Sequence, residues 1–194
     1  MIFGLSRHKK ANRRIVEHIY GELTRAGRRE AFYAEHGVPD TVMGRFEMIA
    51  AQMIVFLRRT GSGSPALKDL AQEIVDAFFE DLDHSMREIG IGDMGVPKRM
   101  KKLARMFYGR YEAYAPALDG GDREGLAAAL ARNVHPKTEP AAMTGADRLG
   151  MLAVADRLIA AASAFDTTSE ADLLAGRIAI VEPGEPQQVA PRAE

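Results

Sequence analysis

A chain of 194 residues has the length of a single domain, and its composition excludes several classes of function. It contains no cysteine, so disulfides, thiolate nucleophiles and cysteine-bound metals are all excluded. Its formal net charge of -1 argues against a general nucleic-acid-binding protein, which is usually basic over its whole domain. The strongest apolar run, residues 46–57, is too short to span a bilayer.

Apolar residues recur at helical spacing along most of the chain. Strand-like alternation is nearly absent apart from a weak candidate at 177–182. We therefore predict an all-α fold, a single-domain bundle of about six to seven helices. In chain order, the predicted helices cover residues 11–26, a short turn at 31–33, then 41–59, 65–89, 97–114, 123–133, 144–165 and a final turn through 173–174.

Polar residues with capping ability mark where several of these helices begin. The helix at 41–59 is apolar around most of its circumference, which is typical of a helix surrounded by others. We expect it to lie at the centre of the bundle. The capping residues are Asp40 or Thr41, Thr144 with Asp147, and Ser169 with Asp172.

The two ends of the chain differ in composition from the part between them. Residues 1–29 contain eight lysines and arginines against two acids, and the C-terminal tail contains three prolines and few apolar residues. We divide the chain into a basic N-terminal segment at 1–14, a helical domain at 15–181 and a disordered tail at 182–194. A short apolar tip precedes the N-terminal cations, the reverse of a secretory signal, so we expect no signal peptide.

The clearest charge pattern lies in the helix at 97–114, whose cations lie mostly opposite its apolar side. Runs of charge are often only solvated surfaces. Six cations in thirteen residues with no acid among them nevertheless exceed what solubility requires. We interpret them, together with the basic N-terminus, as a docking surface for phosphate or anionic lipid. The docking residues are Lys98, Arg99, Lys101, Lys102, Arg105, Arg110, Arg13 and Arg14.

Motifs for catalysis or cofactor binding are missing from the sequence, which has no phosphate-binding loop, dinucleotide fingerprint or nucleophile elbow. Asp81 and His84 have the spacing used by metal-binding bundles, but no second such pair is present. We predict no catalytic residue, no metal site and no cofactor. Asp81 falls on the apolar side of its helix, so we expect its carboxylate to pair with an arginine or tyrosine of a neighbouring helix.

Four segments resemble, in order and spacing, the ubiquinol–cytochrome c chaperone family, and the chain is similar to its bacterial members. They are 32–49, 76–93, 98–114 and 126–135, and the resemblance spans about residues 30–175. It implies a non-enzymatic, all-helical assembly chaperone that binds newly made cytochrome b and promotes assembly of the cytochrome bc complex (complex III). Mitochondrial relatives act with a small partner protein near the ribosome, and the family has no established catalytic residues.

The cationic pattern and the family resemblance support one hypothesis. The cations dock the protein on the ribosome or on the anionic inner face of the membrane, from the cytoplasm, while an apolar groove contacts cytochrome b. The chain also has ten methionines, which either fill the core or line such a groove. The predicted groove residues are Phe32, Tyr33, Phe46, Phe78, Phe79 and Phe107.

Two other functions stay open from the sequence. One is a peripheral membrane or RNA-docking adaptor without a chaperone client, because the cationic helix alone would serve it. The other is a helical enzyme that uses Asp81 with a histidine. The oligomeric state is not determined by the sequence.

Overall fold

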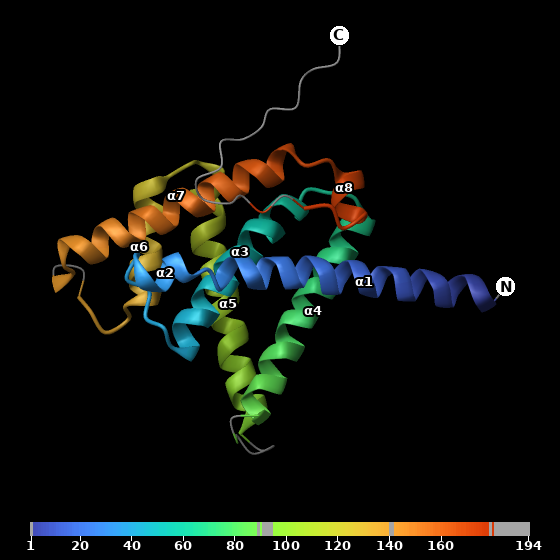
Figure 1. Ribbon diagram of the computed structural model, residues 1–194, viewed down its shortest axis with the longest axis horizontal. Helices are drawn as coiled ribbons and strands as arrows, with labels where there is room; N and C mark the ends of the chain where they lie inside the picture. The colour runs from blue at the N-terminus through green and yellow to red at the C-terminus, as the bar shows by residue number, and fades with distance from the viewer. Residues whose placement is uncertain (1, 89, 91–94, 140–141, 179, 181–194) are drawn as a thin grey trace, which may run out of the picture.

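The computed structural model describes residues 2–88, 90, 95–139, 142–178 and 180, with side chains from residue 12 onward. Figure 1 shows the helices packed around a common centre. Six helices in the described ranges have 12 residues or more, and two have five, which agrees with the predicted all-α bundle. They are α1 (Ile2–Gly27), α2 (Glu30–Ala34), α3 (Val42–Thr60), α4 (Pro65–Glu88), α5 (Val96–Asp119), α6 (Arg123–Val134), α7 (Gly145–Thr167) and α8 (Glu170–Leu174).

Helix α3 forms the centre of the bundle, as its apolar circumference predicts. It contacts α1, α4, α5, α6 and α7, and its residues from Phe46 to Phe56 are all buried. Two of its methionines, Met48 and Met53, are buried in the core, whereas Met43 at its N-terminal end is 43% exposed. Helix α3 is therefore buried by the helices that surround it.

The helix starts agree with the predicted caps. The Thr41 hydroxyl accepts a hydrogen bond from the Gly44 N–H at 3.1 Å and begins α3. At the start of α7, Thr144 and the residue three positions on form a complete capping box. The Ser169 hydroxyl accepts from the Asp172 N–H at 3.1 Å and begins α8. These contacts are local in sequence, which is why spacing alone predicts them.

Two helices are longer than predicted. Helix α1 begins at Ile2 rather than near Ala11, so residues 2–14 belong to a continuous helix. Helix α5 continues past Tyr114 and through Pro116 to Asp119. Its last turn is held because Leu118 is buried in the core. The Asp119 carboxylate also accepts a hydrogen bond from Arg58 of α3 at 2.6 Å.

Helices α4 and α5 form a two-helix arm, whose tip is the end of α4 at Glu88 together with the start of α5 at Val96, at the lower end of the molecule in Figure 1. Helix α1 packs against α4 and runs in the same direction. Asn12 donates to Glu73 at 2.6 Å, and eight residues further along both helices Tyr20 donates to Asp81 at 2.7 Å. The α4–α5 arm therefore has an outer side, which faces solvent, and an inner side, which packs on α1 and α3.

The C-terminal part of the chain follows α8. The described residues of the weak strand candidate, 177, 178 and 180, are in no strand, and the rest of it lies outside the described residues. The tail predicted to be disordered, 182–194, also lies outside them. None of the described helices is long and apolar enough to cross a membrane.

Candidate functional site

Five of the predicted docking residues form one exposed cationic surface on the outer side of the α4–α5 arm, which we call the α5 cationic face. All five are exposed, and within the described ranges none of their side chains forms a hydrogen bond or an ion pair. No carboxylate of the described residues therefore lies within ion-pair distance of them. The five residues are Lys98, Arg99, Lys101, Lys102 and Arg105.

Two of these cations have an unfavourable position for helix stability. Lys98 and Arg99 lie in the first turn of α5, where the backbone dipole already places partial positive charge. Cations stabilise a helix at its other end, by about 0.3–1 kcal/mol each. The placement of Lys98 and Arg99 therefore carries a small cost in helix stability.

Arg110 corrects the sequence analysis, because it does not belong to the α5 cationic face. It is 8% exposed and lies on the inner side of the arm. Its Nε donates to Glu47 Oε2 at 2.5 Å, and its Nη2 donates to the other carboxylate oxygen. Its guanidinium also lies over the Phe46 ring, 5.8 Å from the centroid. Arg110 has nearly the same angle around α5 as the exposed Arg99, eleven residues earlier, so its burial reflects its position further along the helix, where α5 packs on α3.

The Glu47–Arg110 pair is an ionic contact inside the core. Glu47 is 2% exposed, and its burial raises the pKa of its carboxyl while the pairing with Arg110 opposes that rise. Burial also raises the pKa of Tyr114, and the nearby Glu47 charge adds to the effect. The Tyr114 hydroxyl accepts a hydrogen bond from Asn133 at 2.8 Å, which links α5 to α6. This pair positions helices and offers no surface to a partner.

The aromatic residues predicted as a groove are mostly closed core in this structure, which corrects that expectation. Phe46 and Phe78 stack with ring centroids 6.0 Å apart, and Phe107 lies 5.4 Å from Phe78. Only Phe79 and Tyr33 are partly exposed, and they lie on different elements, α4 and α2. The set therefore lines no open groove, and a client role for it stays a prediction. The four buried members are Phe32, Phe46, Phe78 and Phe107.

Asp81 has a partner of the kind that the sequence predicts. The Tyr20 hydroxyl of α1 donates to its carboxylate at 2.7 Å, and both side chains are partly buried. Burial, together with this hydrogen bond, raises the pKa of Tyr20. The contact joins α1 to the inner side of the α4–α5 arm. In the described ranges, no group of three or more metal-ligating side chains surrounds Asp81 or any other residue.

The N-terminal cations lie apart from the α5 cationic face. Arg13 and Arg14 are exposed on α1, and Arg13 donates to Glu17 at 2.8 Å. The neighbouring residue Asn12 contacts Glu73 in the N-terminal half of α4. The end of α4 is fifteen residues further on, about 22 Å along the helix. Arg13 and Arg14 therefore do not extend the α5 cationic face, and Figure 1 shows the N-terminal end of α1 pointing away from the tip of the arm.

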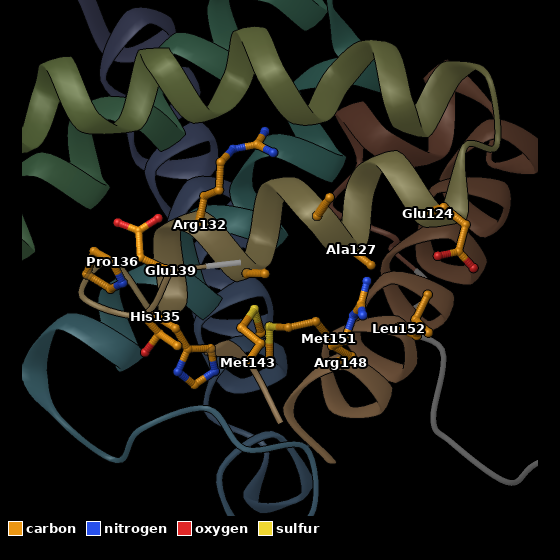
Figure 2. Close-up of a pocket in the computed structure, with 13 residues that line it drawn as sticks. Glu124, Ala127, Arg132, His135, Pro136, Glu139, Met143, Arg148, Met151 and Leu152 are labelled. Carbon is orange, nitrogen blue, oxygen red and sulfur yellow. The ribbon is translucent and has the colours of Figure 1, made fainter. Parts of the chain in front are cut away.

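A cavity that the sequence analysis does not predict lies between α6, α7 and the loop that joins them (Figure 2). Its volume is about 440 Å³. Alanines of α6 and two methionines give it an apolar floor, and charged residues surround the opening. The sequence signal is weak, because alanine runs and proline-containing loops are common. The lining includes Glu124, Ala127, Ala131, Arg132, His135, Glu139, Met143, Arg148, Met151 and Leu152.

Together, the fold and these surfaces define an all-α helical-bundle protein with an exposed cationic helix face and a largely apolar cavity. The chain belongs to the ubiquinol–cytochrome C chaperone family, whose model matches residues 34–180. It is also similar to a solved structure, that of the Cbp3 homolog from Brucella abortus. The two chains are 45% identical, with a TM-score of 0.81, and the match covers 94% of this chain and 97% of that one. No curated protein matches the chain.

Proposed function

We propose that this protein is a non-enzymatic assembly chaperone that binds newly made cytochrome b and promotes assembly of the cytochrome bc complex. The family match across residues 34–180 carries the proposal. Similarity to the Brucella Cbp3 homolog over 94% of the chain supports it, because the whole helical frame is shared. The structural pairing of Asp81 with Tyr20 and of Glu47 with Arg110 is consistent with a binding protein rather than an enzyme that uses these carboxylates.

The α5 cationic face supplies the docking step of this proposal. Each cation near an anionic surface contributes on the order of 1 kcal/mol, less at higher salt. Five unpaired cations would thus give weak, reversible attachment to the inner face of the membrane or to the ribosome, close to where a membrane protein is made. The face lies at the tip of the α4–α5 arm, so the rest of the bundle stays accessible to a client.

Deletion of the gene in the native host tests the proposed function. We expect levels of cytochrome b and of assembled complex III to fall, and expression of the unchanged chain to restore both. Unchanged levels in the deletion strain would refute the chaperone role. Complementation with a variant reversed on the α5 cationic face measures how far assembly depends on docking.

One observation also favours a second function, a peripheral membrane or RNA-docking adaptor without a client. The α5 cationic face would bind either polyanion through charge alone. In that case binding of the purified protein to anionic vesicles or RNA falls steeply with salt, while deletion leaves complex III unchanged. The deletion experiment therefore separates the two functions directly.

A further inference from the structure

A second hollow, which we call the Lys68 hollow, lies at the end of the α4–α5 arm away from its tip, where the last residues of α3 join its lining. Its volume is about 250 Å³. Three polar groups of the lining form no hydrogen bond or ion pair within the described ranges: the ammonium of Lys68 and the hydroxyls of Tyr108 and Tyr111. Lys68 and Tyr108 are exposed, and Tyr111 is partly buried. The lining described contains no acidic residue, so it offers donors and one positive charge to an anionic ligand.

The floor of the Lys68 hollow is apolar. Ala71 and Val75 of α4 line it and are buried, and the partly buried Leu57 of α3 also lines it. The other polar side chain that α4 contributes, Gln72, is already engaged, because its amide donates to Asp76 at 2.8 Å. Unpaired donors around an apolar floor fit a ligand that has an anionic head and an apolar body.

The Lys68 hollow continues the α5 cationic face along the arm. Tyr108 is 52% exposed and lies only about 20° around α5 from Lys101 and about 60° from Arg105. Seven residues separate Tyr108 from Lys101, which is a rise of about 10 Å along the helix. The cations and the hollow therefore share one side of the arm, so a single flat surface can contact them together.

The acids of α4 favour a flat anionic surface over a partner that encloses the arm. Four exposed carboxylates lie about 80–140° around α4 from Lys68, on a different side of the helix. A partner that enclosed the arm would meet these carboxylates, whereas a bilayer contacts one side only. The four acids are Asp69, Glu73, Asp76 and Glu80.

The apolar floor also favours phospholipid over nucleic acid. Both carry phosphate, but the phosphate of a phospholipid is joined to acyl chains, whereas that of RNA is joined to polar sugars. Tyrosine is enriched at membrane–water interfaces, where its ring contacts apolar groups and its hydroxyl contacts polar ones. Two tyrosines beside a lysine therefore match the boundary between headgroups and acyl chains.

We propose that the Lys68 hollow binds one anionic phospholipid of the membrane, with the lipid phosphate held by Lys68 and by the hydroxyls of Tyr108 and Tyr111. The upper part of an acyl chain packs on Ala71 and Val75, while the α5 cationic face lies on the surrounding headgroups. The inference rests on the docking step of the proposed function, and it names the membrane rather than the ribosome as the partner in that step.

Binding of a soluble short-chain lipid to the full chain tests the hollow without a bilayer. The probe is dihexanoylphosphatidylglycerol below its micelle concentration, and isothermal titration calorimetry gives Kd. Tyr108→Phe with Tyr111→Phe keeps both rings and the net charge, and it should weaken binding about tenfold through the loss of two hydrogen bonds to a charged group. Glycerol phosphate, which lacks acyl chains, should bind the unchanged protein more weakly than the lipid. Equal affinities for the two proteins, equal affinities for the two ligands, or no binding of the lipid would overturn the proposal.

Two lysines supply a matched pair for binding to vesicles of phosphatidylcholine and phosphatidylglycerol. Lys68→Gln and Lys137→Gln each remove one charge at an exposed position, and neither lysine forms an ion pair in the described part of the chain. Lys68→Gln should weaken vesicle flotation about fivefold, as expected for one cation near an anionic surface, and Lys137→Gln should change it less than about twofold. Equal losses in the two variants, with circular dichroism showing both folded, would overturn the proposal.

Two further measurements separate the lipid from RNA and from the chaperone role. Binding of a single-stranded RNA oligonucleotide should be the same with and without the two tyrosine hydroxyls. An RNA affinity that fell in the Tyr108→Phe, Tyr111→Phe protein while its vesicle binding stayed unchanged would assign the hollow to nucleic acid and overturn the proposal. In the native host, a deletion strain with normal cytochrome b and complex III would remove the chaperone role, while lipid binding by the purified chain would still stand. A deficient deletion strain, together with equal lipid binding by the unchanged and variant proteins, would overturn the lipid site and leave the chaperone role intact.

Discussion

The outer and inner sides of the α4–α5 arm both carry charged residues, but in the described part of the chain these are exposed and unpaired along α5 on the outer side and paired on the inner side. On the outer side, the five cations of the α5 cationic face are exposed and unpaired. On the inner side, Arg110 is paired with Glu47 and Asp81 accepts a hydrogen bond from Tyr20. Residues of one helix therefore have different roles, because position along the helix, together with rotation around it, decides whether a charge meets solvent or another helix.

The largest expected effect on stability comes from disrupting the ion pair on the inner side of the arm. Arg110→Ala leaves the Glu47 carboxylate buried without its partner, and such losses cost about 3–5 kcal/mol. Chemical denaturation should show this loss in the free energy of unfolding. Replacing both partners, Arg110→Met with Glu47→Leu, should recover most of it, because a buried pair is often no more stable than apolar residues of similar size.

A different result would give Arg110 the docking role of the cations on the outer side of the arm. If Arg110→Ala kept its stability but lost affinity for anionic vesicles, the arginine would act in docking. Its 8% exposure makes us expect the stability effect instead.

The next largest expected effect is on the affinity of the outer side of the arm for anionic vesicles. Reversing two cations, Lys101→Glu with Lys102→Glu, should weaken binding to vesicles of phosphatidylcholine and phosphatidylglycerol by about 30-fold or more at low salt, from about 1 kcal/mol per cation. Vesicle flotation measures this binding. Arg148→Glu with Lys137→Glu changes the net charge equally at exposed positions elsewhere and should have a much smaller effect. Equal losses in the two variants would show that net charge, rather than the α5 cationic face, drives binding.

The inner and outer sides of the arm also differ in how far the sequence predicts them. Thr41 and the Thr144–Asp147 box are predicted correctly, because a cap depends on residues three positions apart. The pairing of Asp81 with a tyrosine also follows from a carboxylate on an apolar helix side. These predictions need only the angle of a residue around its own helix.

Features that depend on which helices pack against one another cannot be predicted from the sequence in this way. The sequence analysis groups Arg110 with the nearby cations, because its angle around α5 is close to that of Arg99 and only the contact with Glu47 of α3 distinguishes it. The aromatic residues were predicted to line a groove, but Phe78 and Phe107 complete a closed core across three helices. The α6–α7 cavity is hardest to predict, because a void is formed by what small residues such as Ala131 do not fill.

A moderate effect is expected where the inner side meets α1. Tyr20→Phe removes the donor to Asp81, and a hydrogen bond to a charged group contributes about 1.5–3 kcal/mol, less for these partly exposed side chains. Thermal and chemical unfolding should both show the loss. Tyr108→Phe is the matched control, because Tyr108 is 52% exposed and should change stability little. A Tyr20→Phe protein as stable as the original would mean that this contact does not fix α1.

The smallest expected effect is a change at Lys98. Its sign is informative, because the same substitution should change stability and vesicle binding in opposite directions. Lys98 is the third residue of α5, where a carboxylate interacts favourably with the helix dipole and a lysine does not. Lys98→Glu should therefore raise the free energy of unfolding by about 0.3–1 kcal/mol and at the same time weaken vesicle binding. Lys98→Gln should lie between the two in both measurements. A Lys98→Glu protein that lost stability along with binding would indicate that the cation supports the fold, and the argument that its position is kept for docking would fail.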